Sequence, residues 1–222
     1  FKVERFTYPL MTPSAARGIL DSIYVKPGQF RWQVKRIEVL RQPQFISLRR
    51  NEVKDVISTP LVKKWMRGTA EPTPIWADGD RDLLGTDVKG RTQRQTVALK
   101  EVRYRIHAEI RPWPRFSARQ QDFEAQFRRR AAAGKCFQQP YFGCREFPAY
   151  FRLLERDSEM QAPAGVDLDL GYMLYDVFDL RRPGSPRSKP AISLFPAQVE
   201  AGVLKVPEMD APEVVRVEQE EA

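Results

Sequence analysis

The chain has very little cysteine and histidine, and it lacks long hydrophobic runs. Its two cysteines, Cys136 and Cys144, are too few for a disulfide scaffold and lack the paired spacing of a zinc site. No apolar run approaches the roughly 18 residues that a membrane span requires, and no basic-then-apolar leader is present. We therefore expect free thiols in a reducing cytoplasm and no membrane partner. Because the sequence opens on Phe1 rather than Met, we expect the natural N-terminus to lie upstream.

The charge of the chain is unevenly distributed. The net charge is +8, but residues 199–222 hold seven acidic and two basic side chains, a local net charge of −5, so the remainder carries +13. Such an excess is typical of a protein that binds a polyanion, most often nucleic acid. The alternative is a basic protein that is merely soluble, and we weight nucleic acid above it.

Residues 12–27 have the pattern of one amphipathic helix. Thr12 is a good N-cap, and Pro13 suits the first helical position, where no N–H is needed. Apolar residues recur at the spacing of one buried face: Ala16, Ile19, Leu20 and Ile23. Residues 26–28, Lys-Pro-Gly, end the helix. Tyr24 falls at the seam between the two faces, so we expect its ring to contact the core and its hydroxyl to reach solvent.

Two strands and a long loop are expected next. Residues 30–40 alternate as a strand, and a shift of phase at Lys35-Arg36 predicts a β-bulge. Residues 44–53 have the pattern of a second strand. Residues 66–95 are polar and rich in Gly, Pro and Asp, which predicts a long loop. A Gly-rich loop fixes no ligand geometry, so we expect no metal site at its three closely spaced aspartates: Asp78, Asp80 and Asp82.

The single histidine lies on the polar face of a further predicted strand. Apolar and polar residues alternate without a break over residues 101–110, and successive side chains of a strand point to opposite faces. His107 belongs to the polar set, whereas a core histidine would belong to the other. Arg105 should lower the imidazole pKa and Glu109 should raise it, so we expect a pKa near neutrality, as proton transfer requires.

A second amphipathic helix is predicted over residues 117–135. Ser117 is its candidate N-cap, Phe123 and Phe127 mark the apolar side, and Gly134 is a C-terminal stop. The arginine triplet at 128–130 fits a dipole-matched helix end and a phosphate contact equally well. Three later segments (149–155, 171–180 and 191–207) predict an antiparallel β appendage, with a basic loop at 181–190.

Four stretches of the sequence resemble subtype d of the fifth CRISPR-associated (Cas) protein family: "YPLMTPSAARGILDSIYVKP", "FISLRRNEV", "RTQRQTVALKEVRYRIHA" and "GKCFQQPYFGCREFPAYF". The resemblance implies an α+β fold of the repeat-associated mysterious protein (RAMP) superfamily. We therefore expect a ferredoxin-like, RRM-type domain at residues 1–140, whose first strand would precede Phe1. A small antiparallel β-sheet domain at 141–207 and an acidic, disordered tail at 208–222 should follow.

The resemblance also implies a function. Family members are metal-independent endoribonucleases that bind the hairpin of the CRISPR repeat transcript and cut at the 3′ base of its stem. They remain on the 5′ handle of the crRNA as a subunit of the type I-C interference complex. No cofactor is expected, and the expected partners are repeat RNA, crRNA, and the backbone and large subunits of that complex. Duplex DNA stays open as a further partner. The alternative function is a non-catalytic RNA-binding subunit that caps the 5′ handle.

The resemblance assigns catalysis to Tyr24, at the end of the first helix, and to His107 on its strand. The family also has a lysine on that strand, but no lysine stands beside His107, so Lys26 and Lys100 are candidates for the catalytic cation. Metal-free RNA cleavage by the 2′-hydroxyl gives a 2′,3′-cyclic phosphate. It needs a base, an acid for the leaving 5′-oxygen and a cation for the phosphorane. His107 suits either of the first two roles, with Tyr24 as its partner. Lys26, Lys100 or Arg105 could supply the cation.

Seven arginines are candidate RNA contacts: Arg17, Arg49, Arg50, Arg94, Arg103, Arg105 and Arg128. Two pairs, Arg49-Arg50 and Arg103 with Arg105, should form one phosphate-tracking stripe, because we expect the strands that carry them to adjoin in one sheet. An acidic, unpatterned tail neither packs nor favours RNA. Deletion of residues 208–222 is therefore expected to leave cleavage intact.

Overall fold

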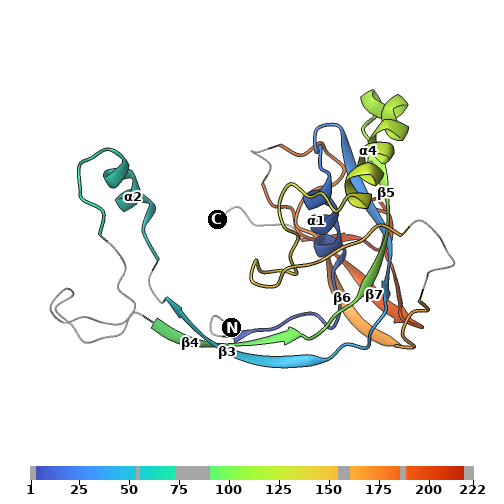
Figure 1. The fold of residues 1–222 in the computed structure, drawn as a ribbon, viewed down its shortest axis with the longest axis horizontal. Coiled ribbons are helices and arrows are strands. Elements are labelled where there is room, and N and C mark those ends of the chain that lie inside the picture. Colours follow the sequence, from blue (N-terminus) through green and yellow to red (C-terminus); the bar gives the residue numbers. More distant parts are fainter. Residues whose placement is uncertain (1–3, 54–55, 74–90, 155–160, 186–188, 218–222) are drawn as a thin grey trace. The chain divides into compact units, whose positions relative to one another are not determined.

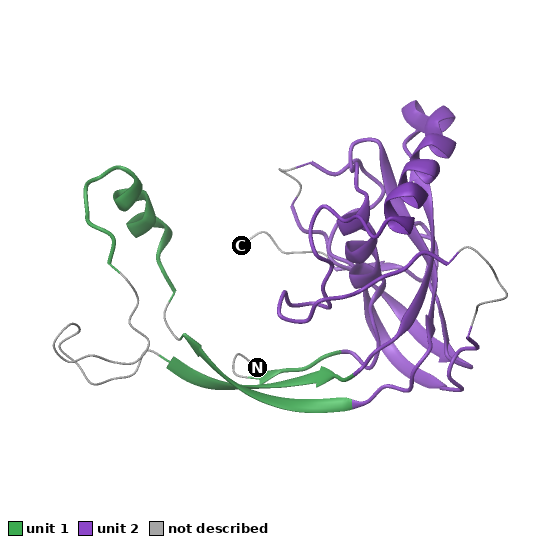
Figure 2. Ribbon diagram, in the orientation of Figure 1, with its two compact units in different colours: residues 1–7, 45–100 green, residues 8–44, 101–222 purple. Residues whose placement is uncertain are grey.

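The structure, a computed structural model, describes residues 4–53, 56–73, 91–154, 161–185 and 189–217 (Figure 1). The chain divides into unit 1, residues 1–7 with 45–100, and unit 2, residues 8–44 with 101–222 (Figure 2). Helices and mainly antiparallel sheets make up both units, so the predicted α+β class is confirmed.

Unit 1 is a long β-hairpin. Its strands β3 (Phe45–Val53) and β4 (Arg91–Leu99) pair along their whole length, and β1 (Glu4–Arg5) adds parallel to β4. Helix α2 (Thr59–Met66) lies in the connection between β3 and β4. Among the described residues of this unit only Thr96 is buried, so the hairpin has no apolar core of its own there.

The hairpin differs from the long loop predicted at 66–95. Strand β4 already begins at Arg91, and the end of α2 occupies Met66. Residues 74–90, which carry the three aspartates considered above, lie outside the described residues. The strand was missed because both of its faces are largely polar, and a strand without a buried face has no apolar alternation.

Unit 2 is built on a six-stranded sheet with the order β5-β2-β8-β7-β6, and β9 pairs with β7. Its strands are β2 (Phe30–Val39), β5 (Tyr104–Pro112), β6 (Leu168–Asp176), β7 (Ser193–Glu200), β8 (Val203–Lys205) and β9 (Val215–Arg216). The register of β2 on β5 shifts between Val34 and Arg36, which confirms the predicted bulge. Because β8 pairs with β2, the predicted 141–207 domain shares one sheet with the N-terminal part.

Helix α1 (Pro13–Ile23) forms as its local sequence predicts. The Thr12 hydroxyl accepts from Ala15 N at 3.1 Å, Pro13 occupies the first turn, and the four predicted apolar residues are buried. The helix contacts β2 and β6. Each of the larger side chains, Ile19, Leu20 and Ile23, contributes about 1.5–3 kcal/mol when fully buried.

Helix α4 (Gln120–Ala132) follows a 3₁₀ helix, η1 (Pro114–Arg119). Ser117 is therefore not the N-cap of α4; it lies inside η1, where its hydroxyl donates to Pro114 O at 3.1 Å. The predicted stop is confirmed, because Gly134 has φ +64° and its N–H donates to Ala131 O. Lys135 N donates to Arg130 O, which completes a Schellman motif.

Two clusters of buried side chains form the core of unit 2. The larger contains Val34, Ile37, Phe195 and Leu204 and joins α1 to the strands β2, β7 and β8. The smaller contains Tyr24, Phe30, Trp32, Ile110 and Phe123, so it lies between the end of α1, the strands β2 and β5, and α4. The smaller cluster fixes the position of Tyr24.

The C-terminal segment is packed as far as it is described. Met209 is 1% exposed, Val214 is 7% exposed and β9 pairs with β7. The predicted disordered tail therefore differs from the structure over residues 208–217, and residues 218–222 lie outside the described part. The acidic composition led to the prediction of disorder, although the segment contains Met209 and Val214, which belong to the larger core cluster. The strand predicted at 149–155 is also absent from its described residues, 149–154.

Both cysteines are free thiols, as predicted, and both are half-buried. Over the described ranges, the structure has no helix that is long and apolar enough to cross a membrane.

Candidate active site

Tyr24 closes the first helix and is held on three sides. As the C-cap of α1 it has extended backbone angles, and its N–H donates to Leu20 O at 2.9 Å. Its ring packs on Phe30 with 5.3 Å between the ring centroids, and Trp32 Nε1 donates to the Tyr24 carbonyl at 3.0 Å. The residue is 9% exposed, so its ring contacts the core as expected.

Cationic side chains surround Tyr24. Lys26 Nζ lies 5.9 Å from the centroid of the Tyr24 ring, and Arg130 Nε donates to Ile23 O at 2.6 Å. Burial raises the pKa of the Tyr24 hydroxyl, and the charges of Arg119 and Arg130 oppose that rise in part. The phenol therefore stays protonated at neutral pH, where it can donate a hydrogen bond but is a poor base.

The two candidate lysines differ in their positions. Lys26 is exposed and belongs to unit 2, two residues after Tyr24. Lys100 is also exposed, but it follows β4 in unit 1. Lys26 is thus the lysine that the structure of unit 2 places beside the Tyr24 ring.

His107 lies on β5 in a charged cluster centred on Glu38. Its Nε2 is 2.8 Å from Glu38 Oε1, although the N–H direction does not fit a hydrogen bond. The other carboxylate oxygen of Glu38 accepts from Arg105 Nη1. Burial lowers the His107 pKa, Glu38 raises it, and Arg36 lowers it further, so the net change is downward and the imidazole is neutral at pH 7. The carboxylate that acts on His107 is Glu38 and not Glu109, which pairs with Lys35 and Arg111.

Tyr24 and His107 lie on opposite faces of the β2–β5 pair. Ile106 and Ala108 pack against the cluster that contains Tyr24, and Ile110 belongs to it. Side chains alternate along a strand, so His107 points to the other face, where its cross-strand partner is Arg36. The structure therefore does not bring the two predicted catalytic side chains together.

The adjacency of strands expected for the arginine stripe is wrong, because β3 pairs with β4 in unit 1 while β5 pairs with β2 in unit 2. Arg49 and Arg94 lie on the hairpin, where Arg94 also pairs with Glu52 at 3.3 Å, and Arg50 faces Arg94 across the ladder. Arg103 and Arg128 are exposed in unit 2. Arg105 is 8% exposed and bound to Glu38 and to Gln161 O.

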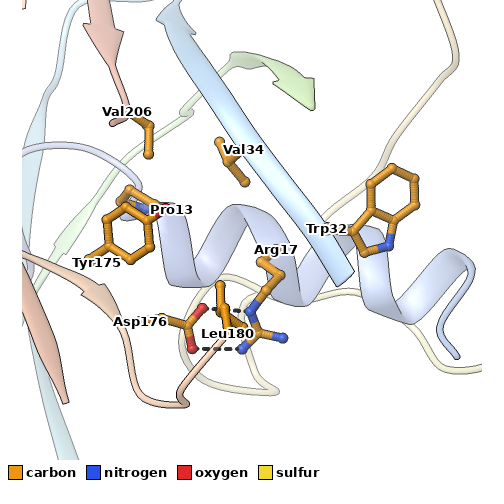
Figure 3. Close-up of a pocket in the computed structure, with 8 residues that line it drawn as sticks. All are labelled: Pro13, Arg17, Trp32, Val34, Tyr175, Asp176, Leu180 and Val206. Atoms are coloured by element: carbon orange, nitrogen blue, oxygen red, sulfur yellow. Dashed lines mark hydrogen bonds and ion pairs between the residues drawn. The ribbon is translucent and has the colours of Figure 1, made fainter. Parts of the chain in front are cut away.

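Arg17 is part of an internal ion pair. Two of its guanidinium nitrogens donate to the two carboxylate oxygens of Asp176, at 2.5 and 3.1 Å, at the edge of a small pocket between α1, β2 and β6 (Figure 3). A third nitrogen donates to Asp21. The Arg17 guanidinium is bound to two carboxylates, and that of Arg105 is bound to one carboxylate and one backbone carbonyl, so neither favours a contact with RNA.

The described part of the chain contains no group of three or more His, Cys, Asp or Glu side chains arranged to hold a metal ion. The chemistry that unit 2 offers is that of Tyr24 and its cations. Sequence reasoning missed Arg119 and Arg130, which act on the Tyr24 hydroxyl, and Glu38, which binds His107. No local sequence pattern marks these three residues, because Arg119 and Arg130 lie on other elements than Tyr24, and Glu38 lies on another strand than His107.

Comparison with known proteins connects this geometry to a family. Residues 1–207 match the model of a family described as CRISPR-associated protein (Cas_Cas5). The CRISPR pre-crRNA endoribonuclease Cas5d of Mannheimia succiniciproducens is 36% identical over 221 residues, covering 97% of this chain and 91% of the relative. The Cas5d of Thermus thermophilus, which carries the same description, is 36% identical over 231 residues, covering 99% of this chain and 89% of the relative.

Solved structures support the fold alone. A crystal structure of a CRISPR-associated protein has a TM-score of 0.58 and 19% identity, and the match covers 95% of this chain and 87% of that one. A functionally uncharacterized protein from Streptococcus mutans has a TM-score of 0.57 and 18% identity, with coverage of 96% and 91%.

Proposed function

The chain belongs to the Cas5d family of CRISPR-associated proteins, and from this membership we propose that it is an endoribonuclease that processes CRISPR repeat RNA. The observation that carries the proposal is the 36% identity, over nearly the whole chain, to two curated pre-crRNA endoribonucleases. The charge of +13 outside the acidic C-terminal stretch supports a polyanionic substrate.

We propose that cleavage takes place at Tyr24. Its protonated hydroxyl can donate a hydrogen bond to the attacking 2′-oxygen or to the scissile phosphate, and it is fixed by the packing of its ring and by Trp32. Lys26 and Arg119 are the cations suited to the charge that develops on the phosphorane. The 2′-hydroxyl would lose its proton to water and form a bond to phosphorus, and the P–O5′ bond would break with the 5′-oxygen taking a proton from water. The products are a 2′,3′-cyclic phosphate and a 5′-hydroxyl.

The finer aspects of the function follow from the family resemblance. We propose that the enzyme binds the repeat hairpin and cuts at the 3′ base of its stem without a metal ion. It would then stay on the 5′ handle as a subunit of the type I-C interference complex in the prokaryotic cytoplasm. Cleavage of the repeat hairpin in the presence of a chelator, with a cyclic phosphate at the new end, tests this proposal. Binding without cleavage would favour the non-catalytic alternative.

Tyr24→Phe isolates the hydroxyl, because the ring still packs on Phe30. We expect the single-turnover cleavage rate at saturating enzyme to fall about 10²–10⁴-fold with little change in hairpin affinity. Tyr172→Phe on β6 is the matched control, because that tyrosine is 61% exposed and lies on the strand farthest from β5 in the sheet order. A Tyr24→Phe enzyme that cuts at the wild-type rate would move the active site elsewhere.

His107→Ala tests whether the lone histidine transfers a proton. If it does, the same single-turnover rate should fall about 10²–10⁴-fold. The position of His107 on the face opposite Tyr24 favours a different result, a rate close to that of the wild type. In that case the histidine serves the Glu38 cluster.

A further inference from the structure

Two aromatic side chains are exposed on the segment that follows α4. Phe137 is 65% exposed and Tyr150 is 87% exposed. Single exposed apolar side chains are common and need no explanation. These two differ because their backbone is fixed and because both adjoin the residues that hold Tyr24.

Hydrogen bonds hold this segment in place. Phe137 N donates to Ser22 O at 2.8 Å, which ties the segment to the last turn of α1, two residues before Tyr24. Ala149 N donates to Pro140 O at 2.8 Å, and Gln139 Nε2 donates to Ala149 O at 2.8 Å. The segment therefore turns back on itself, and Phe137 and Tyr150 both lie at the open end of this turn, outside the hydrogen bond between Pro140 and Ala149. In Figure 1 it is the yellow chain that leaves α4 and passes α1.

The segment also contacts the core around Tyr24. Phe151, the residue after Tyr150, and Leu153 pack against the cluster that contains Tyr24, Phe30 and Trp32. The backbone of Phe137 is thus bound to α1, which carries Tyr24 at its end. Tyr150 precedes Phe151, which packs against the core around Tyr24.

Exposed cations on this segment and beside Tyr24 suit a phosphate backbone. Lys26, Lys135 and Arg152 are exposed, and Arg119 acts on the Tyr24 hydroxyl. Exposed aromatic rings among cationic side chains are the usual means by which proteins hold unpaired nucleotides: the bases stack on the rings and the cations contact the phosphates. A duplex offers no free base faces, so the chemistry selects an unpaired strand.

We propose that Phe137 and Tyr150 stack on unpaired nucleotides of the RNA that flank the cut, and so position the scissile phosphate at Tyr24. This inference rests on the proposed function, since it assigns the two rings to the substrate of that site. The stacking is independent of base identity, whereas the hairpin supplies the register.

The test uses repeat hairpin RNAs that carry one 2-aminopurine in the unpaired flank, moved one position at a time on either side of the stem. A 2′-deoxy sugar at the last nucleotide of the 3′ side of the stem, whose 2′-hydroxyl is the attacking group, and at every unpaired position prevents cleavage during the measurement. Stacking on an aromatic ring quenches 2-aminopurine fluorescence, and we expect quenching at one or two adjacent positions with the wild-type protein. Phe137→Ala and Tyr150→Ala should each remove quenching at their position and raise the dissociation constant about 5-fold to 100-fold. Phe137→Trp and Tyr150→Phe should retain both.

Tyr172→Ala is the control, because it removes another exposed tyrosine of unit 2. An abasic nucleotide at the quenched position should make wild type and Phe137→Ala bind equally, since each change removes the same contact. Quenching and affinity that survive both alanine substitutions would overturn the inference. A wild-type protein that quenches 2-aminopurine but cuts no ribose-containing hairpin would instead overturn the proposed function and leave the stacking site in place.

Discussion

Asp21→Asn should raise the free energy of unfolding at pH 8. At pH 5 the increase should be smaller. Asp21 shares the Arg17 guanidinium with Asp176, and its side chain is 25% exposed. Burial raises the pKa of the Asp21 carboxyl from its ordinary value of 3.8 to about 6; Arg17 opposes that rise and Asp176 adds to it. Asn keeps an oxygen that can accept from Arg17 and removes only the charge.

The sign follows from proton binding. Between about pH 4 and pH 6 the folded chain binds more protons at Asp21 than the unfolded chain does, so the free energy of unfolding falls as the pH rises through this window. A pKa shift from 3.8 to about 6 lowers the free energy of unfolding by about 3 kcal/mol at pH values above the window. At pH 5 the loss is about half of that. The Asn variant does not lose this free energy, because its side chain does not ionise. Its advantage over the wild type should therefore grow by about 1.5 kcal/mol between pH 5 and pH 8.

Urea unfolding of both proteins at pH 5 and pH 8, followed by intrinsic fluorescence, measures the four free energies. Trp32, which is 3% exposed, reports on the core beside α1. Asp122→Asn is the matched control, because that aspartate is 70% exposed in its ion pair with Arg119. Its effect on stability should be nearly the same at both pH values. An Asp21→Asn protein that is less stable than the wild type at pH 8 would refute the reasoning, since the attraction to Arg17 would then exceed the cost of burial.

Two further predictions follow from the packing of unit 2. A chain that ends at residue 217 should match the full chain in urea midpoint and in cleavage. A chain that ends at residue 207 should lose several kcal/mol of unfolding free energy, because Met209 and Val214 leave the core and β9 leaves β7; equal stability would show that the segment is dispensable. Arg105→Ala should lower the unfolding free energy by about 1.5–3 kcal/mol, because the buried Glu38 carboxylate loses one charged hydrogen bond while Arg36 and His107 remain beside it. Arg103→Ala, at an exposed position, should leave stability unchanged and reduce the salt dependence of hairpin binding by roughly 0.7–0.9 in log–log slope. The reverse pattern would place Arg105 on the RNA.

The sequence predicted correctly those features that depend on short-range conformational preferences, such as helix ends and a β-bulge. Thr12 and Pro13 mark the start of α1, Gly134 ends α4, and the phase shift at Lys35 locates the bulge of β2. Each of these features depends on the conformational preference of one or two residues. A sequence pattern can therefore reveal them without knowledge of the partners.

The pairing of the strands could not be predicted from local sequence patterns. Strands β3 and β5 have similar basic patterns, and only the long-range ladders show that β3 belongs to β4 and β5 to β2. The packing of residues 208–217 was hidden because a few apolar side chains stand among acidic ones.

The separation of Tyr24 and His107 could have been foreseen. Alternation along β5 places His107 on the polar face, and an amphipathic helix covers the apolar one, so a residue at the end of that helix belongs to the other side. What no pattern could supply is the identity of Glu38 as the partner of both His107 and Arg105, because the two strands meet only in the folded chain.

The hairpin of unit 1 is inserted between two strands that must find each other. Val39 of β2 pairs with Tyr104 of β5, across about 60 intervening residues. Once Phe45 has paired with Leu99, the loop that remains to be closed is only about 10 residues long. Loop-closure entropy grows as (3/2)RT ln n, so the preformed hairpin would reduce the cost of joining β2 to β5 by about 1.5 kcal/mol, roughly tenfold in rate. A hairpin that forms before β2 meets β5 would thus shorten the search by which unit 2 folds, and changes that weaken it would then slow folding even where the finished core is untouched.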